Sequence, residues 1–191
     1  MNKVFNIIIA GVGGQGLITL NNLIANAAFY DGYDVKTSEL HGLSQRVGSV
    51  ETHLKFGKKI YSPLVVAGKA DLVLGLETTE GLRAIRFFNP KTIFVVNDNY
   101  ISFLENISKE EVEKKIKSSI GSNLRLVSAS EICKKELGKE VVSSIYLLGY
   151  CVFKKIIPLN SESVLRAIEE TIPEKYLELN KKAFELAKKH D

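Results

Sequence analysis

Glycines crowd the segment that follows the first apolar run of the chain. The run NIIIA is followed at once by GVGGQG and then by a helical pattern. Glycine permits the positive φ angles and the close backbone approach that a tight strand-to-helix turn requires. The backbone N–H groups at the start of the helix then favour a phosphate or carboxylate. This predicts either an anion or cofactor contact or a turn that serves only close packing. The candidate binding residues of this glycine turn are Gly11, Gly13, Gly14, Gln15 and Gly16.

A second group of polar residues follows the second predicted strand. Glu39, 23 residues past Gly16, ends that strand, where a dinucleotide-binding enzyme carries the acid that binds a ribose. The segment beyond it holds a titratable imidazole, two hydrogen-bonding side chains and a guanidinium that can bind a carboxylate or phosphate with two bonds. The alternative is a solvated loop whose side chains cap one another. The candidate active-site residues of this segment are His41, Ser44, Gln45 and Arg46.

Other polar residues are better explained by structural roles. His53 lies on an alternating strand and is predicted to be a half-buried packing residue. Glu77 ends a buried strand and is predicted to cap or begin the next helix. Asn97 and Asp98 close a further strand and are assigned to a turn. The sequence has neither a recognisable metal-ligand spacing nor a catalytic serine motif, so we predict no metal on this chain.

The elements that must position these residues alternate between strands and helices. Strands are predicted at 4–11, 33–39, 70–77, 91–98 and 123–129. Helices are predicted at 15–32, 78–88, 109–120, 130–137, 141–156, 161–172 and 173–190, with Ser130 as an N-cap. The segment 49–62 alternates and is predicted to form a hairpin that turns at FGKK. The fold class is therefore α/β, a three-layer α/β/α, Rossmann-like arrangement with a mixed, mostly parallel sheet and a helical C-terminal part.

Composition and charge narrow the function classes. The 191 residues, 45% of them hydrophobic, suit one domain over 1–191. Residues 1–100 carry 10 Lys and Arg against 8 Asp and Glu, and residues 101–191 carry 16 against 14, an even spread that disfavours a nucleic-acid partner. The two cysteines are too few for an iron–sulfur cluster and are predicted to be buried thiols. We expect a cytoplasmic protein with no membrane partner, because no apolar run approaches the roughly 20 residues of a membrane span.

Three motifs together resemble one family. GVGGQG, ELHGLSQRVGSVETHLKFG and SPLVVAGKADLVLGLE are similar to the gamma-type subunit of 2-oxoacid:ferredoxin oxidoreductases, and the resemblance runs over essentially the whole chain. The C-terminal segment that begins YLLGYCVFKK is most similar to the beta subunit of the indolepyruvate enzymes. The chain departs from the family at Val47, the first of two positions after SQR where the family commonly has glycine.

The resemblance implies oxidative decarboxylation of a 2-oxo acid, indolepyruvate or another aryl pyruvate, to an acyl-CoA, with the electrons passed to ferredoxin. It implies that thiamine diphosphate, Mg²⁺ and [4Fe–4S] clusters lie on a larger partner subunit and that this chain is inactive alone. The glycine turn and the segment from His41 to Arg46 would then close against that partner, with coenzyme A as a co-substrate that could contact them. Two alternatives stay open, a stand-alone NAD(P)- or nucleotide-binding Rossmann-like enzyme and a regulatory module.

Overall fold

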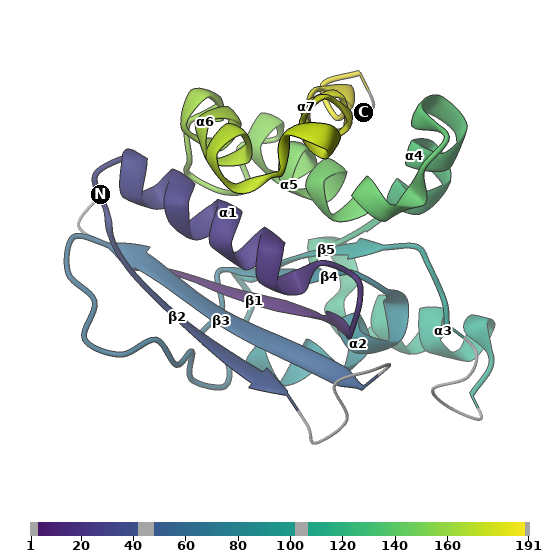
Figure 1. Ribbon diagram of the computed structural model, residues 1–191. Helices are drawn as coiled ribbons and strands as arrows, with labels where there is room; N and C mark the ends of the chain where they lie inside the picture. Colours follow the sequence, from purple (N-terminus) through teal and green to yellow (C-terminus); the bar gives the residue numbers. More distant parts are fainter. Residues whose placement is uncertain (1–3, 42–47, 102–106, 190–191) are drawn as a thin grey trace.

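The computed structural model describes residues 4–41, 48–101 and 107–189. In these ranges six strands form one sheet in the order β2-β3-β1-β4-β5-β6 (Figure 1). β3 runs antiparallel to both of its neighbours, and the other pairs are parallel. The strands are β1 (Phe5–Val12), β2 (Asp34–His41), β3 (Ser49–Gly57), β4 (Leu72–Gly75), β5 (Ile93–Asn97) and β6 (Leu124–Val127). The predicted mixed, mostly parallel sheet is confirmed.

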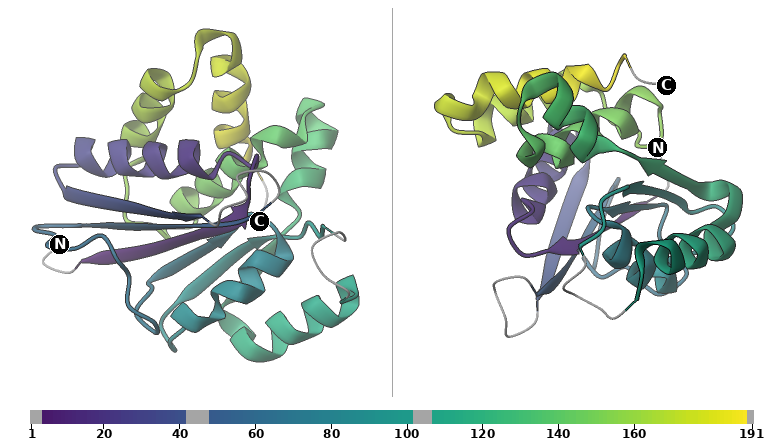
Figure 2. Two further views of the ribbon diagram at one scale, coloured as in Figure 1. Left: turned by 60° about the horizontal axis from the view of Figure 1, so that its bottom comes forward. Right: turned by 90° about the vertical axis from the view of Figure 1, so that its right-hand side faces the viewer.

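Helices cover both faces of the sheet, as Figures 1 and 2 show. One face carries α1, α5, α6 and α7, with α4 beside them, and the other carries α2 and α3. The helices are α1 (Leu17–Tyr30), α2 (Thr78–Arg83), α3 (Lys109–Ile120), α4 (Ala129–Leu137), α5 (Ser143–Phe153), α6 (Ser161–Thr171) and α7 (Glu174–Leu186). Because α1 follows β1 onto one face and α2 follows β4 onto the other, a crevice opens between the carboxyl ends of these two strands.

Alternation along β1 divides the apolar core between the two faces. Ile7 and Ile9 pack in the cluster beneath α1 and the C-terminal helices, whereas Ile8 and Ala10 pack in the cluster beneath α2 and α3. Successive strand residues point to opposite faces, so a strand covered on both sides is apolar throughout. The predicted apolar stripe of α1 is confirmed, because its members are all buried: Leu17, Leu20, Leu23, Ile24, Ala27 and Ala28.

The predicted hairpin at FGKK is wrong. β3 ends at Gly57, and the chain leaves the sheet instead of returning as a strand. Asp34 Oδ2 accepts a hydrogen bond of 2.7 Å from the Ile60 backbone N–H, and His53 Nδ1 accepts one of 3.0 Å from the Val65 N–H. These bonds hold the segment after β3 against β2 and against the face of β3. The antiparallel partners of β3 are therefore β2, which precedes it, and β1.

The helix predicted at 109–120 has the same bounds as α3. Ser108 and Glu111 form a capping box at its start. Cys133 and Cys151 are both buried, as predicted. No helix in the described ranges is both long enough and apolar enough to cross a bilayer.

Helices α5 and α7 make a close contact at Gly149, and a substitution there tests it. A Cβ at this position of α5 would lie 2.4 Å from the Phe184 carbonyl oxygen of α7. We expect Gly149→Ala to lower the free energy of unfolding by about 1–3 kcal/mol, because overpacked cores must shift backbone. Urea unfolding of both proteins measures the difference. Helix propensity alone gives the opposite sign, roughly 1 kcal/mol of stabilisation, so a more stable variant would contradict the contact.

Candidate functional site at the carboxyl edge of the sheet

The glycine turn joins β1 to α1 and uses glycine for two separate reasons. Gly14 and Gly16 have φ angles of 98° and 77°, in the region that side chains disfavour. Gly11 lies in a close approach, because a Cβ there would lie 2.6 Å from Gln15 Oε1 and 3.1 Å from the Leu76 Cβ beyond β4. The ends of β1 and β4 are already paired in the sheet, and the turn leaves β1 at the edge of the crevice.

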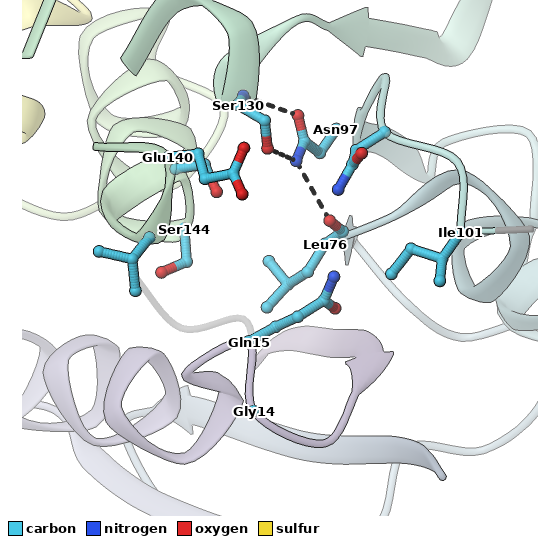
Figure 3. Close-up of a pocket in the computed structure, with 11 residues that line it drawn as sticks. Gly14, Gln15, Leu76, Asn97, Ile101, Ser130, Glu140 and Ser144 are labelled. Carbon is cyan, nitrogen blue, oxygen red and sulfur yellow. Dashed lines mark hydrogen bonds between the residues drawn. The ribbon is translucent and has the colours of Figure 1, made fainter. Parts of the chain in front are cut away.

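Gln15 folds back over the turn. Its Oε1 accepts a hydrogen bond of 2.9 Å from the Val12 backbone N–H. Because only the carboxamide oxygen can accept, this bond fixes which end of the side chain faces the turn. Figure 3 shows the Gln15 side chain reaching from the turn toward Leu76.

A first hollow of about 300 Å³ lies in the crevice (Figure 3). It is bounded by the glycine turn, the carboxyl ends of β4 and β5, and the starts of α4 and α5. Open α/β sheets bind ligands at such a switch point. Its lining residues are Gly14, Gln15, Leu76, Asn97, Asn99, Ile101, Ser130, Glu140, Val141, Ser143 and Ser144.

Asn97 holds the wall of this first hollow together. Its Nδ2 donates to the Leu76 carbonyl oxygen at 3.2 Å and to Ser130 Oγ at 2.8 Å, and its Oδ1 accepts from the Ser130 N–H at 3.2 Å. The prediction that Ser130 caps α4 is wrong, because Ser128 is the N-cap and Ser130 lies in the first turn. Asn97 is more than the predicted turn residue. The sequence showed only an asparagine at the end of an apolar run, which does not reveal this role.

A second hollow, of about 530 Å³, lies beside the start of α1. Gly13, Gly14, Gly16, Leu17, Ile18, Thr19, Glu39 and Val50 line it. The first helical hydrogen bond of α1 runs from the Leu20 N–H to the Gly16 carbonyl, and no side chain caps this end. The helix start therefore offers N–H groups and a partial positive charge suited to an anion. The Glu39 carboxylate beside it suits a hydroxyl donor.

A third hollow, of about 400 Å³, opens on the face that carries α2. Its charges are paired internally. The side chain of Glu80 is 2% exposed and accepts hydrogen bonds from Ser49 Oγ and Arg83. Both carboxylate oxygens of Glu51 lie 2.8 Å from the same guanidinium nitrogen of Arg86. Sequence reasoning did not single out these carboxylates or arginines.

Glu77 takes the structural role predicted for it, and His53 is a packing residue as predicted but is 3% exposed rather than half-buried. His53 is buried, its Nδ1 accepts from Val65, and its Nε2 lies 2.9 Å from Glu51 Oε1. Glu77 is the N-cap of α2 and accepts hydrogen bonds from the N–H groups of Thr79 and Glu80. Burial raises the pKa of the Glu77 carboxyl, although these N–H groups oppose the shift.

The two predicted motif segments meet at the carboxyl edge. β1 and β2 both run antiparallel to β3, so their carboxyl ends lie at the same edge. His41 is the last residue of β2, and the Gly13 N–H donates a 3.0 Å hydrogen bond to the Gly48 carbonyl at the other end of the segment. The candidates Ser44, Gln45 and Arg46 lie outside the described residues.

Comparisons with known proteins agree over nearly the whole chain. The family model described as pyruvate ferredoxin/flavodoxin oxidoreductase matches residues 6–189. The indolepyruvate oxidoreductase subunit IorB of Thermococcus kodakarensis is 33% identical over 194 residues, covering 98% of this chain and 96% of that protein. The pyruvate/ketoisovalerate oxidoreductases common subunit gamma of the same organism is 32% identical over 185 residues, covering 93% and 91%.

A solved structure shares the fold. The 2-oxoglutarate:ferredoxin oxidoreductase from Magnetococcus marinus with 2-oxoglutarate, coenzyme A and succinyl-CoA bound matches with a TM-score of 0.76 at 18% identity. The match covers 99% of this chain and 31% of that one. In that protein the fold is therefore one part of a longer chain.

The third hollow predicts a pH-dependent contribution to stability. Burial alone would raise the pKa of Glu51, but hydrogen bonds from His53 and the Arg86 guanidinium outweigh it and hold the pKa below its usual value. We expect Glu51→Gln to cost about 1–2 kcal/mol of unfolding free energy at pH 7, because two charge-assisted bonds are weakened. A lowered carboxyl pKa stabilises the folded state above the unfolded pKa, and this stability is lost as the pH falls through the folded pKa.

The measurement is urea unfolding of both proteins between pH 7 and pH 3. The difference should shrink below the usual carboxyl value of 4.5. Glu178→Gln, on an exposed position of α7, controls for the loss of one surface carboxylate. A gap between wild type and Glu51→Gln that stays constant across this range would show that the carboxylate charge contributes nothing.

Proposed function

Since the chain belongs to the pyruvate ferredoxin/flavodoxin oxidoreductase family and is a subunit of a 2-oxoacid:ferredoxin oxidoreductase, we propose that its complex acts on indolepyruvate or another aryl pyruvate. The family match over residues 6–189 is the observation that carries the subunit assignment. The substrate is proposed from the curated relatives. Identity to the indolepyruvate and pyruvate/ketoisovalerate relatives differs little, but the indolepyruvate relative aligns over 98% of the chain against 93%.

The proposed reaction is an oxidative acyl transfer. The C1–C2 bond of the 2-oxo acid breaks, and C1 leaves as CO₂. A bond forms between C2 and the sulfur of coenzyme A, the thiol proton is released, and the electron pair passes to ferredoxin. Thiamine diphosphate, when bound, supplies the carbanion chemistry that makes the bond cleavage feasible. This chain would contribute positioning and a closed surface.

We place the cofactors on the larger subunit. Iron–sulfur clusters are held by cysteine thiolates. Cys133 and Cys151 are buried, and burial raises the pKa of both thiols, that of Cys133 to about 11, which opposes the thiolate form. The described residues also contain no group of three His, Cys, Asp or Glu side chains that could hold a metal ion.

The carboxyl edge is the surface proposed to close on that subunit. Each of its three hollows has one exposed apolar residue beside it: Ile18 (53% exposed), Leu40 (46%) and Val141 (70%). A subunit that closed over this edge would remove all three apolar side chains from water, which favours association. The Magnetococcus marinus protein, in which this fold forms part of a longer chain, supports a close association.

Coenzyme A is proposed to contact the second hollow. The uncapped start of α1 suits a phosphate, and Glu39 suits a ribose hydroxyl. The segment from His41 to Arg46 begins where β2 ends at this edge, and it would supply the guanidinium. The Magnetococcus marinus structure contains coenzyme A and succinyl-CoA, which makes this ligand a reasonable choice.

Arg46→Ala in the reconstituted complex tests the site. We expect the KM for coenzyme A to rise roughly 10- to 100-fold, because a charged hydrogen bond is worth about 1.5–3 kcal/mol. Assembly and the KM for the 2-oxo acid should be unchanged. Lys91→Ala, an exposed cation before β5, is the matched control. Unchanged coenzyme A dependence would remove Arg46 from the site.

The stand-alone dinucleotide enzyme is not favoured. In the dinucleotide-binding fold the neighbour of β1 on this side is a parallel strand, whereas here the antiparallel β3 separates β2 from β1. Titration of the purified chain with NAD(H) and NADP(H) distinguishes the oxidoreductase subunit from a stand-alone dinucleotide-binding enzyme. Tight binding by the chain alone, together with failure to form a stoichiometric complex with a thiamine-diphosphate protein, would favour the enzyme.

A further inference from the structure

The first hollow contains a hydrogen-bond donor whose direction is fixed. Gln15 Oε1 accepts from the Val12 N–H, so Nε2 is the end directed away from the turn. Gln15 lines the hollow, and Nε2 has no acceptor among the described residues. A donor held in one orientation without a protein acceptor is suited to an incoming acceptor group.

Ser144 supplies a second donor from the opposite wall. The residue lies in the first turn of α5, is 6% exposed and lines the same hollow. Its hydroxyl faces the glycine turn, because a Cβ placed on Gly16 would lie 3.8 Å from Ser144 Oγ. Within the described ranges this hydroxyl makes no hydrogen bond, and its oxygen is not fully buried, so it stays open to the hollow.

The charge of the hollow indicates what the acceptor is. Among its described lining residues there is no Lys, Arg or His, and the one charged group is the exposed carboxylate of Glu140. A phosphate or carboxylate would be repelled by Glu140. A neutral carbonyl can accept from Gln15 and Ser144, and an adjoining N–H can donate to Glu140. This is the pattern of an amide.

We propose that the first hollow receives an uncharged polypeptide segment of the larger subunit, whose backbone carbonyl accepts hydrogen bonds from Gln15 Nε2 and Ser144 Oγ. The proposal rests on the proposed function and names the contact that joins the two subunits. Val141 is 70% exposed at the rim. Like Ile18 and Leu40 at the other two hollows, it is an exposed apolar side chain that a covering chain would bury, which favours such a chain over a small ligand.

Gln15→Glu tests the fixed donor. The new carboxylate keeps the hydrogen bond from the Val12 N–H and replaces only the outward donor by an acceptor. A carboxylate at the start of α1 is also favourable to the helix, so the melting temperature of the chain should not fall. We expect the dissociation constant of the two-subunit complex, measured by biolayer interferometry, to rise at least about tenfold, because an acceptor would face an acceptor.

Asn22→Asp is the matched control, because it adds the same charge at an exposed position of the same helix and should leave the dissociation constant unchanged. If wild type itself does not associate, the proposed function fails. If wild type associates and Gln15→Glu binds equally well, only the present inference fails. A higher KM for coenzyme A at unchanged association would also overturn it, in favour of a small-molecule site.

Cross-linking identifies the occupant directly. Val141→Cys introduces an accessible thiol, since the chain's own Cys133 and Cys151 are buried. A short photoreactive maleimide on this thiol should cross-link, in the assembled complex, to one segment of the larger subunit whose contacting residues are uncharged. Phe29→Cys, 68% exposed near the other end of α1, is the control. Equal cross-linking from both positions, or a highly charged target segment, would refute the proposal.

Discussion

The hydrogen bond from the Gly13 N–H to the Gly48 carbonyl connects the two motif segments of the chain. It is available only because β3 runs antiparallel between β2 and β1, so that the connection from β2 into β3 lies at the same edge as the end of β1. The three hollows open around this edge. The positive φ angles of Gly14 and Gly16 complete the arrangement, since they let α1 start directly above it.

Local patterns were sufficient for most of the fold. Strands such as β1 and β4 are covered on both faces, so they appear in the sequence as nearly continuous apolar runs, interrupted in β1 only by Asn6. The amphipathic patterns of α1 and α3 were equally clear, whereas the capping box of α3 was found only in the structure. FGKK resembles a hairpin turn, which is why the prediction was wrong. In the structure Asp34 Oδ2 accepts a hydrogen bond from the Ile60 N–H, and this bond holds the chain outside the sheet after β3. Such a contact, 26 residues apart in sequence, leaves no local signal.

The sequence predicted where the candidate site lies but only some of the residues that line it. The glycine turn and the end of β2 meet as the strand order requires. Asn97, Ser130 and Ser144 come together only because β5, α4 and α5 converge on the crevice, and nothing in their sequence neighbourhoods indicates this. The roles of Ser44, Gln45 and Arg46, and the single-domain organisation, stay predictions.

The two sides of the carboxyl edge treat polar groups differently. On the α2 side, Glu80 and Glu51 are neutralised by arginines and satisfied by further hydrogen bonds, as buried charges must be. On the α1 side, Gln15 and Ser144 keep donors that no described residue accepts. Neither donor atom is fully buried, so both stay open to solvent or to another molecule. The charges on the α2 side are already paired with one another, whereas the open donors on the α1 side can bind a partner.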